Sequence, residues 1–311
     1  MSMLYIGMDG GGTHTTAVAA APDGHVLSRA SGPGLNWLND GLDACVRRFG
    51  HLVSSLLEQV KEREDGSSLT VCAGLAALDG PADPEVLAAF QSVLPPGSRL
   101  ILESDLSVAL AGLTSGKPGL IAVCGTGSMV LCRNNTGREL SAGGWGWKVG
   151  DPGSGYMLAR KGLFQGLFRL QTEGRETPLL QAALSYFSVP DAQALIPALY
   201  ATDRDTAALA AFGAEVLRLA EQGDPDAHGI LSRQMEQLAL LAASLLASTP
   251  EAAGCVGLFG GVFQHSELAR SLFSEALAAR CPGVYPHILQ TPPAVGAVIL
   301  AMQREGRKDI L

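Results

Sequence analysis

The chain has 311 residues, of which 47% are hydrophobic and 17% are charged, with a formal net charge of −8. This composition is that of a folded globular protein with enough apolar residues for one large core or two smaller ones. The acidic balance and the lack of a long basic cluster argue against a nucleic-acid partner, because phosphate binding needs concentrated positive charge.

Neither a secretory signal nor a membrane segment is expected from the sequence. The longest apolar run, 238–247, is about half of what a helix needs to cross a bilayer. The six cysteines form no CxxC pair and no metal-ligand spacing with histidine, so we interpret them as reduced thiols. These features predict a cytoplasmic protein.

The N-terminal residues predict a glycine-rich turn between two strands. The strands are expected at 4–9 and 15–21, and a hairpin turn at 22–24 leads to a third strand at 25–30. The motif Asp-Gly-Gly-Gly-Thr lies at 9–13, at the end of the first strand. A strand follows it, whereas the dinucleotide-binding fingerprint opens a helix, so that fingerprint is excluded.

Alternating helices and strands follow. From 40 to 64 apolar residues recur at steps of three and four, which predicts an amphipathic helix capped by Asn39 or Asp40. The next elements are a strand, a helix, a strand and a helix, expected at 69–75, at 84–94, at 99–103 and from Ser104-Asp105 onward.

The pattern of the N-terminus then returns at 121–137. Here too an apolar strand is followed by a glycine turn with a hydroxyl residue, a second strand and a polar turn. The repeat aligns Gly125-Thr126-Gly127-Ser128 with Gly10-Gly11-Gly12-Thr13, and it aligns Cys124 with Asp9. It predicts two similar α/β halves with a cleft between them.

The remaining chain combines a glycine-dense loop, a helical stretch and a final α/β segment. The loop spans 141–155 and leads into a helix beginning near Tyr156, after which the chain is mostly helical to Thr249 with a break at 223–225. A strand, a helix, a strand and a helix are then expected at 255–259, 266–280, 284–289 and 293–305.

Two glycine turns after strands suit a polyphosphate, because glycine lets backbone N–H groups approach phosphate oxygens. Asp9 and Asp105 both follow strands, where carboxylates can hold magnesium or accept a proton. Two structural alternatives stay open: the first turn is an ordinary hairpin, and Asp105 is an ordinary helix N-cap.

The loop at 141–155 has the residue types of a sugar site. Trp145 offers an apolar ring for a sugar face and Asp151 an acceptor for a hydroxyl, although either tryptophan of the loop can instead fill the core. Asn36 is either a ligand contact or a helix cap, and Gly260-Gly261 is either a nucleoside contact or a tight turn.

Together these motifs resemble the ASKHA superfamily, which includes sugar kinases, actins and heat-shock chaperone ATPases. Within it the chain is most similar to the BadF/BadG/BcrA/BcrD-type family and its N-acetylglucosamine kinases. The resemblance covers nearly the whole chain and rests on five motifs: DGGGT at 9–13, ESDLSVAL at 103–110, GTGS at 125–128, GGWGWKVGDPGSG at 143–155 and FGGV at 259–262.

The resemblance implies two ribonuclease H-like domains of the actin/hexokinase type, at 1–115 and 116–311, with the last helix packing back on the first domain. It implies ATP and Mg²⁺ as cofactors, with Asp9 placing the metal through water and Asp105 as the catalytic base. The implied ATP-binding residues are Asp9, Gly10, Gly11, Gly12, Thr13, Gly125, Thr126, Gly127, Ser128, Gly260 and Gly261. The implied substrate-binding residues are Asn36, Thr126, Gly127, Gly144, Trp145 and Asp151.

The expected activity is phosphorylation of an amino sugar at its 6-hydroxyl, with N-acetylglucosamine favoured over glucosamine or glucose. The implied partner is therefore a small-molecule sugar, and a homodimer is compatible with the family. Pro152 departs from the acid or amide that the family commonly has at this position. A second branch of the family activates 2-hydroxyacyl-CoA dehydratases through a shared iron–sulfur cluster, but Cys124 and Cys132 do not reproduce its cysteine pattern.

Overall fold

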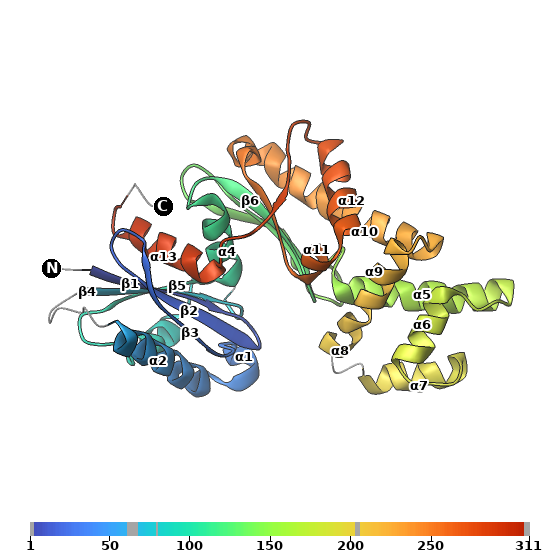
Figure 1. The fold of residues 1–311 in the computed structure, drawn as a ribbon, viewed down its shortest axis with the longest axis horizontal. Helices are drawn as coiled ribbons and strands as arrows, with labels where there is room; N and C mark the ends of the chain where they lie inside the picture. Colours follow the sequence, from blue (N-terminus) through green and yellow to red (C-terminus); the bar gives the residue numbers. More distant parts are fainter. Residues whose placement is uncertain (1–2, 61–67, 79, 203–205, 308–311) are drawn as a thin grey trace. The chain divides into compact units, whose positions relative to one another are not determined.

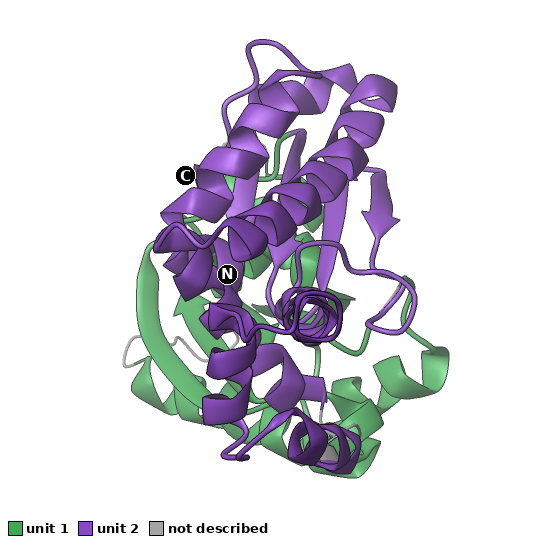
Figure 2. Ribbon diagram, turned by 90° about the vertical axis from the view of Figure 1, so that its right-hand side faces the viewer, with its two compact units in different colours: residues 1–117, 289–311 green, residues 118–288 purple. Residues whose placement is uncertain are grey.

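The computed structural model describes residues 3–60, 68–78, 80–202 and 206–307. The chain divides into two compact units, shown in two colours in Figure 2. Unit 1 comprises Met1–Lys117 and Leu289–Leu311, and unit 2 comprises Pro118–Ile288. The C-terminal segment therefore belongs to the same unit as the N-terminus.

Unit 1 is built on a five-stranded sheet with the order β3-β2-β1-β4-β5. Its first three strands are antiparallel neighbours, whereas β4 and β5 run parallel to β1. The strands are β1 (Met3–Gly10), β2 (His14–Ala20), β3 (Val26–Pro33), β4 (Ser68–Leu75) and β5 (Arg99–Ser104). All five strands expected in this part of the sequence are confirmed.

Helices cover both faces of this sheet (Figure 1). One core lies under α2 and α3, and a second lies under α4 and α13. The helices of unit 1 are α1 (Trp37–Asp40), α2 (Leu42–Gln59), α3 (Pro84–Gln91), α4 (Asp105–Thr114) and α13 (Pro293–Arg304).

The prediction of a single helix at 40–64 is wrong in its boundaries, because the structure has two helices, α1 and α2, in this region. Gly41, with a φ of 82°, separates α1 from α2 and occupies the N-cap of α2, so neither Asn39 nor Asp40 caps this helix. The C-cap of α2 is Val60, which is extended, and the expected residues 61–64 lie outside the described part of the chain. Gly41 interrupts the helical pattern because a left-handed φ is incompatible with a continuous helix.

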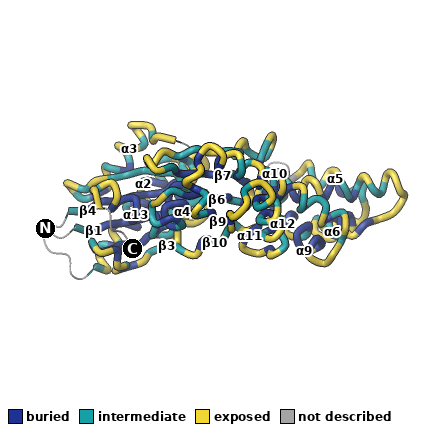
Figure 3. The backbone as a smooth tube through the Cα atoms, turned by 90° about the horizontal axis from the view of Figure 1, so that it is seen from above, coloured by how far each residue is buried: buried dark blue, intermediate teal, exposed yellow. Residues whose placement is uncertain are grey.

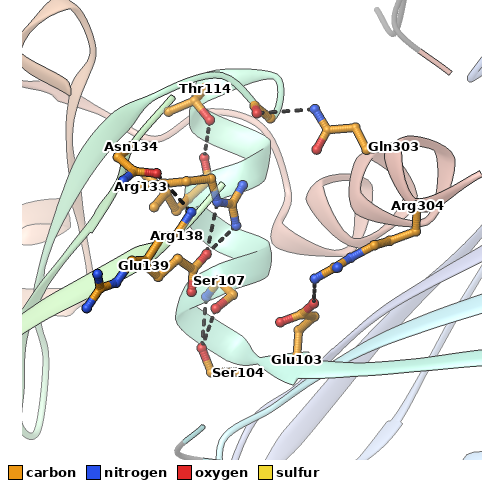
Figure 4. A network of polar contacts seen from close by, with 12 residues as sticks. Glu103, Ser104, Ser107, Thr114, Arg133, Asn134, Arg138, Glu139, Gln303 and Arg304 are labelled. Atoms are coloured by element: carbon orange, nitrogen blue, oxygen red, sulfur yellow. Dashed lines mark hydrogen bonds and ion pairs between the residues drawn. The ribbon is translucent and has the colours of Figure 1, made fainter. Parts of the chain in front are cut away.

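Two glycines, which have no side chains, let α13 lie directly on β1 and α4. A Cβ on Gly7 would stand 2.1 Å from the backbone oxygen of Ala294, and one on Gly296 would stand 1.9 Å from that of Val108. The far end of α13 is held by polar contacts, since Arg304 pairs with Glu103 (Figure 4). The residues of α13 are largely buried (Figure 3), which explains how the last helix becomes part of unit 1.

Unit 2 repeats the plan of unit 1. Its sheet has the order β10-β9-β6-β7-β8, again with an antiparallel meander and two strands parallel to the first. The strands are β6 (Gly119–Cys124), β7 (Ser128–Arg133), β8 (Glu139–Gly143), β9 (Val256–Phe259) and β10 (His287–Ile288). This confirms the duplication and the two ribonuclease H-like halves.

Three boundaries in this unit differ from expectation. Residues up to Gly143 form the third strand of the meander, so the glycine-dense loop begins later than 141. The strand expected at 284–289 is reduced to β10. The turn after β9 contains a short helix of its own, α11 (Gly261–His265), because Gly260 adopts a φ of 98° and reverses the chain.

Most of unit 2 outside the sheet is helical, as expected, and its core is continuous across sheet and helices. The break at 223–225 is confirmed between α9 and α10. No helix in the described part of the chain is both apolar enough and long enough for a membrane span. The further helices are α5 (Gly155–Glu173), α6 (Pro178–Tyr186), α7 (Ala192–Thr202), α8 (Thr206–Ala211), α9 (Gly213–Glu221), α10 (Pro225–Ser248), the 3₁₀ helix η1 (Pro250–Gly254) and α12 (Glu267–Ala278).

The packing of α13 predicts opposite effects for two glycine-to-alanine changes. Gly296→Ala should destabilise unit 1 by about 1–3 kcal/mol or more, because its Cβ would collide with the backbone of α4. Gly229 lies in the interior of α10, and in the described part of the chain no atom is within 4 Å of the added Cβ, so Gly229→Ala should be neutral or stabilising by up to about 1 kcal/mol. Urea unfolding measures both, and equal effects would contradict this account.

Candidate functional site

Two aspartates lie at one edge of the unit 1 sheet. Asp9 is next to the last residue of β1 and pairs in register with Gly74 of β4, which in turn pairs with Glu103 of β5. Asp105 comes directly after β5. Since β1, β4 and β5 are parallel, their carboxyl ends meet at the same edge, where α/β proteins commonly bind ligands.

The electrostatic environment of these two carboxylates is unfavourable to their charged forms. Burial, followed by the negative charge of Asp105, raises the pKa of Asp9 to about 6. Burial also raises the pKa of Asp105, although the N–H of Leu106 opposes this by donating to its carboxylate. Among the described residues, no lysine or arginine forms an ion pair with either aspartate. Within the described residues, the two charges are therefore not balanced by an ion pair with the protein.

The helix-cap interpretation of Asp105 is wrong. Ser104 is the N-cap of α4, and its hydroxyl oxygen accepts a hydrogen bond from the N–H of Ser107 (Figure 4). Asp105 is the first residue of the helix. Ser104 therefore caps the start of α4, and the carboxylate of Asp105 accepts the N–H of Leu106 without being the cap.

The first glycine loop contains one glycine that the fold requires and one that it does not. A Cβ on Gly10 would stand 2.8 Å from the side chain of Leu75. Gly12 is exposed, has no left-handed φ, and no described atom lies within 4 Å of its missing Cβ. The described chain thus gives no structural reason for glycine at this position. Open space beside backbone N–H groups, next to the exposed Thr13, suits a phosphate.

The segment after β3 is packed against this loop, which sequence reasoning missed. Gly34 donates its N–H to the carbonyl of Thr13, and a Cβ on Gly34 would stand 2.4 Å from the carbonyl oxygen of Gly12. This contact brings Asn36 near the glycine loop. The Gly-Pro-Gly run at 32–34 is the sequence signal of this close backbone approach.

Asn36 is the N-cap of α1, as one of its two interpretations held. Its side-chain oxygen accepts a hydrogen bond of 3.1 Å from the N–H of Leu38. Its amide nitrogen donates no hydrogen bond within the described part of the chain. A ligand contact by Asn36 therefore remains a prediction, and the amide nitrogen is the group that can make it.

The second glycine loop has the same character. Gly125 has no left-handed φ, no atom of the described residues lies within 4 Å of its missing Cβ, and Thr126 is exposed. The N–H of Gly155, at the start of α5, donates to the carbonyl of Gly125 at 2.7 Å. Ser128 is buried, and its hydroxyl donates to the carbonyl of Pro152. The loop is thus attached at both ends to the segment that precedes α5.

Asp151 lies directly against the second glycine loop. One of its carboxylate oxygens is 2.9 Å from the place where a Cβ of Gly127 would be, which explains glycine at that position. Its carboxylate accepts hydrogen bonds from the N–H groups of Gly146 and Ser128, which lower its pKa, but burial dominates and raises the pKa. The residue also has a φ of 63°. Such strain in a non-glycine residue is typical of functional sites.

The two tryptophans of the loop differ in exposure. Trp145 is 78% exposed, which excludes a role in filling the core of unit 2. Trp147 is half-buried against Tyr156, with ring centroids 5.1 Å apart, so it packs the base of the loop. Gly144, beside Trp145, is exposed and donates its N–H to the carbonyl of Ser128.

Gln234 of α10 is a further positioning residue that the sequence did not reveal. It is buried, and its side-chain oxygen accepts a hydrogen bond of 3.0 Å from the N–H of Gly153. A glutamine on a long helix, 81 residues away, carries no local signal of this contact. Its effect is to fix the segment between Asp151 and α5.

Gly260 and Gly261 lie where β9 leads into α11. A Cβ on Gly260 would stand 2.5 Å from the carbonyl oxygen of Cys124, so a tight turn accounts for this glycine. Beyond α11, a cavity of about 840 Å³ opens between α9, α10, α11 and α12, and His228 and His265 are among its lining residues. Within the described residues, no three histidine, cysteine or acidic side chains form a metal-binding group.

The structure thus brings the predicted residues together within each unit. Asp9, the first glycine loop and Asp105 share one sheet edge in unit 1. The second glycine loop, Asp151 and Gly260 form a connected group in unit 2. Their roles in binding and catalysis remain predictions at this point.

The chain is similar to several sugar kinases. It is 26% identical over 298 residues to the N-acetylmuramic acid/N-acetylglucosamine kinase of Clostridium acetobutylicum, covering 95% of this chain and 97% of that one. It is 31% identical over 205 residues to the N-acetyl-D-glucosamine kinase of Dictyostelium discoideum, covering 63% of this chain and 64% of that one. That second match therefore spans slightly less than two thirds of the relative.

A solved structure shares the fold over nearly its whole length. A candidate N-acetylglucosamine kinase from Chromobacterium violaceum is 27% identical, with a TM-score of 0.75, and the match covers 96% of this chain and 99% of that one. The model of one protein family matches residues 6–301, which include every predicted site residue. The chain belongs to the BadF/BadG/BcrA/BcrD ATPase family.

Proposed function

We propose that this chain is an ATP-dependent kinase that phosphorylates an amino sugar at its 6-hydroxyl, with N-acetylglucosamine as the favoured substrate. The observation that carries the proposal is the pair of buried aspartates, Asp9 and Asp105, at one sheet edge, with which no lysine or arginine of the described residues forms an ion pair. Membership of an ATPase family, and relatives named as kinases of N-acetylated amino sugars, support the choice of reaction.

Both glycine loops would bind the phosphates of one ATP. The support is that Gly12 and Gly125 leave open space that the described chain does not use, each next to an exposed threonine, Thr13 or Thr126. Backbone N–H groups in such turns, together with hydroxyl groups, bind phosphate oxygens. The other residues proposed for this role are Gly10, Gly11, Gly127 and Ser128.

The aspartate pair fits Mg²⁺. Magnesium prefers carboxylate oxygens and usually takes only one or two of them from the protein, with water and substrate phosphates completing its shell. The charged form of Asp9 is disfavoured first by burial and then by Asp105, and we propose that this residue holds the metal through water. When bound, the metal supplies positive charge that offsets the charge of the phosphates.

Asp105 would act as the general base. Burial raises its pKa, which makes its carboxylate a better proton acceptor than an exposed aspartate. The sugar's 6-hydroxyl gives its proton to Asp105 while its oxygen forms a bond to the γ-phosphorus. The bond from that phosphorus to the bridging oxygen breaks, and ADP leaves with the electron pair.

Unit 2 would bind the sugar mainly through Trp145 and Asp151. The exposed ring of Trp145 offers an apolar face, and Asp151 is held rigidly by two backbone N–H groups. Gly144 and the shared residues Thr126 and Gly127 would approach the sugar closely, and Asn36 would donate from its amide nitrogen. Pro152 offers no polar side chain to a sugar, and its carbonyl accepts the hydrogen bond from the hydroxyl of Ser128 that holds the loop.

The nucleoside of ATP would lie against Gly260 and Gly261, with the cavity beyond α11 available to it. We further propose that the domains of the kinase are 1–115 and 116–311, with α13 returning to the first. An ATP-consuming enzyme with six free thiols suits the reducing cytoplasm, where we place its action. We also propose a homodimer as its assembly, with which the family resemblance is compatible.

Asp105→Asn tests the proposed base. Asparagine keeps the size of the side chain but cannot accept the proton, so sugar-dependent ADP formation should fall by about 10²–10⁴-fold. ATP binding, followed by calorimetry, should persist. Asp83→Asn is a matched control in the same unit, because Asp83 caps α3 and asparagine caps equally well. Full activity of Asp105→Asn would contradict the assignment.

The raised pKa of Asp9 predicts a pH-dependent stability difference. The carboxyl group of Asp9 binds its proton more tightly in the folded state than in the unfolded chain, so protonation of Asp9 stabilises the folded state. This stabilisation is fully present below about pH 4 and is lost as the pH rises through about 6. In EDTA, Asp9→Asn should therefore be about 1–3 kcal/mol more stable than the unchanged chain at neutral pH. At about pH 4 the two should be equal.

Urea unfolding at both pH values measures this difference. Cys124→Ala, at the equivalent strand end of unit 2, is the comparison variant. Its difference in stability from the unchanged chain should be the same at both pH values. With Mg²⁺ present, Asp9→Ala should lower turnover far more than Cys124→Ala does. A stability difference that does not change with pH would refute the proposed environment of Asp9.

A panel of sugars tests the substrate. ADP formation should be stimulated by N-acetylglucosamine more than by glucosamine, N-acetylmannosamine, glucose or N-acetylmuramic acid. A preference for glucosamine or glucose would support the assignment as a kinase but would contradict N-acetylglucosamine as its substrate. ATP hydrolysis that is independent of all these sugars, in a brown and oxygen-sensitive protein, would instead indicate a dehydratase activator.

A further inference from the structure

Thr16 of β2 lies directly opposite Asp9 of β1. The two residues are partners in the antiparallel register of these strands. Side chains of directly opposite residues point to the same face of a sheet, and their Cβ atoms are about 4.5–5.5 Å apart. The side chain of Thr16 is therefore a close neighbour of the Asp9 carboxylate.

The face that Thr16 and Asp9 share is the one that α4 covers. Gly74 of β4 is the partner of Asp9 on its other side, and a Cβ on Gly74 would stand 2.3 Å from the side chain of Val108 of α4. The charge of Asp105, the first residue of α4, also acts on Asp9. Thr16 thus lies on the same face of the unit 1 sheet as the proposed metal site.

Along β2, this face changes from apolar and buried to polar and accessible. Val18 and Ala20 alternate with Thr16 on the same face, and both belong to the core under α13. Thr16 is only partly buried, and His14, two residues before it, is exposed. The apolar core thus ends before Thr16, which leaves this residue accessible to a ligand that approaches Asp9.

The hydroxyl group of Thr16 is not used by the described fold. Its neighbour Thr15 lies on the opposite face, is buried, and donates its hydroxyl to the carbonyl of Pro33 at 2.8 Å. The hydroxyl of Thr16, in contrast, makes no hydrogen bond to any of the described residues. Valine is as favourable as threonine in a strand, so the shape of the side chain does not require a hydroxyl here. The fold therefore leaves a polar group beside Asp9 that a ligand can use.

A water molecule that is bound to a cation needs two hydrogen-bond acceptors. Its lone pair points at the cation, so it donates both of its protons, and Mg²⁺ usually keeps several such waters. The carboxylate of Asp9 accepts one proton, and a threonine hydroxyl has lone pairs that accept another. We propose that Thr16 is a positioning residue whose Oγ1 accepts the second proton of a water that Mg²⁺ holds against Asp9. This inference rests on the proposed function, since it concerns the same metal site.

The test is the affinity for ADP, measured by calorimetry once with Mg²⁺ and once with EDTA. Thr16→Val keeps the shape of the side chain and removes its oxygen. It should weaken ADP binding about tenfold with Mg²⁺, because residues that orient metal-bound groups contribute on this scale, and it should leave ADP binding in EDTA unchanged. Thr16→Ser restores an oxygen at the same place and should bind ADP with Mg²⁺ nearly as tightly as the unchanged chain.

Ser31 of β3 offers a matched control on the same face of the sheet. It is the partner of Thr16 on the side away from β1, and it is exposed. Two strand spacings separate it from Asp9, which is about 10 Å. This is too far for a shared water, so Ser31→Ala should leave ADP binding unchanged with Mg²⁺ and with EDTA. Urea unfolding checks that the variants at both positions remain folded.

Two results would overturn this role of Thr16. Thr16→Val that binds ADP with Mg²⁺ as tightly as the unchanged chain would show that the hydroxyl does not act on the metal. An equal loss of affinity with Mg²⁺ and with EDTA would show that Thr16 contacts the nucleotide or supports the fold instead. Either result leaves the proposed kinase intact if the unchanged chain still forms ADP with a sugar. A chain that binds neither ADP nor ATP would overturn the proposed function, and this inference with it.

Discussion

The burial of two carboxylates at the edge of one sheet is the constraint on which the proposed chemistry depends. Parallel strands end together, so β1 and β5 place Asp9 and Asp105 at the same edge with only β4 between them. Burial removes part of the water that would screen their charges. A folded protein keeps such a pair when a cation or a transferred proton uses it, and phosphoryl transfer from ATP uses both.

The surrounding structure positions both side chains. Ser104 caps α4, and the carboxylate of Asp105 accepts a hydrogen bond from the N–H of Leu106 in the first turn of the helix. The packing of α13 on β1 and α4 fixes the two elements that carry the aspartates. The same strand plan in unit 2 carries Cys124 where unit 1 has Asp9.

The two units therefore hold their carboxylates differently. In unit 2 the acid is Asp151, which comes from a loop and accepts two backbone N–H groups. Burial, with Asp151 nearby, raises the pKa of the Cys124 thiol, which keeps it neutral. Unit 1 thus presents two buried carboxylates at one sheet edge, whereas unit 2 presents a hydrogen-bond acceptor that is fixed by its own loop.

Much of the fold followed from the sequence because its signals are local. Apolar strands ending in glycine turns identified β1, β2, β6 and β7 and the duplication of the sheet. The division at Gly41 was missed because a single glycine inside a periodic pattern is often tolerated in a helix. The strand β8 was missed because its glycine-rich end resembles a loop.

The candidate site was predicted to a similar extent, because only those of its residues that carry a local sequence signal could be identified. The glycine loops, Asp9 and Asp105 are marked by residue types that local structure does not explain. The roles of Gly34 and Gln234 depend on contacts with distant segments, and no local pattern encodes such contacts. Whether Asp105 or Ser104 caps α4 depends on backbone geometry at one residue, which sequence alone does not determine.

The most direct measurement of the central claim is the position of the phosphate in the product. The chain is incubated with ATP, Mg²⁺ and N-acetylglucosamine, and the product is examined by ³¹P nuclear magnetic resonance with proton coupling. The account predicts one sugar phosphate for each ADP, with its phosphorus coupled to the two protons on carbon 6. Release of inorganic phosphate alone, or a phosphate coupled to the proton on carbon 1, would contradict it.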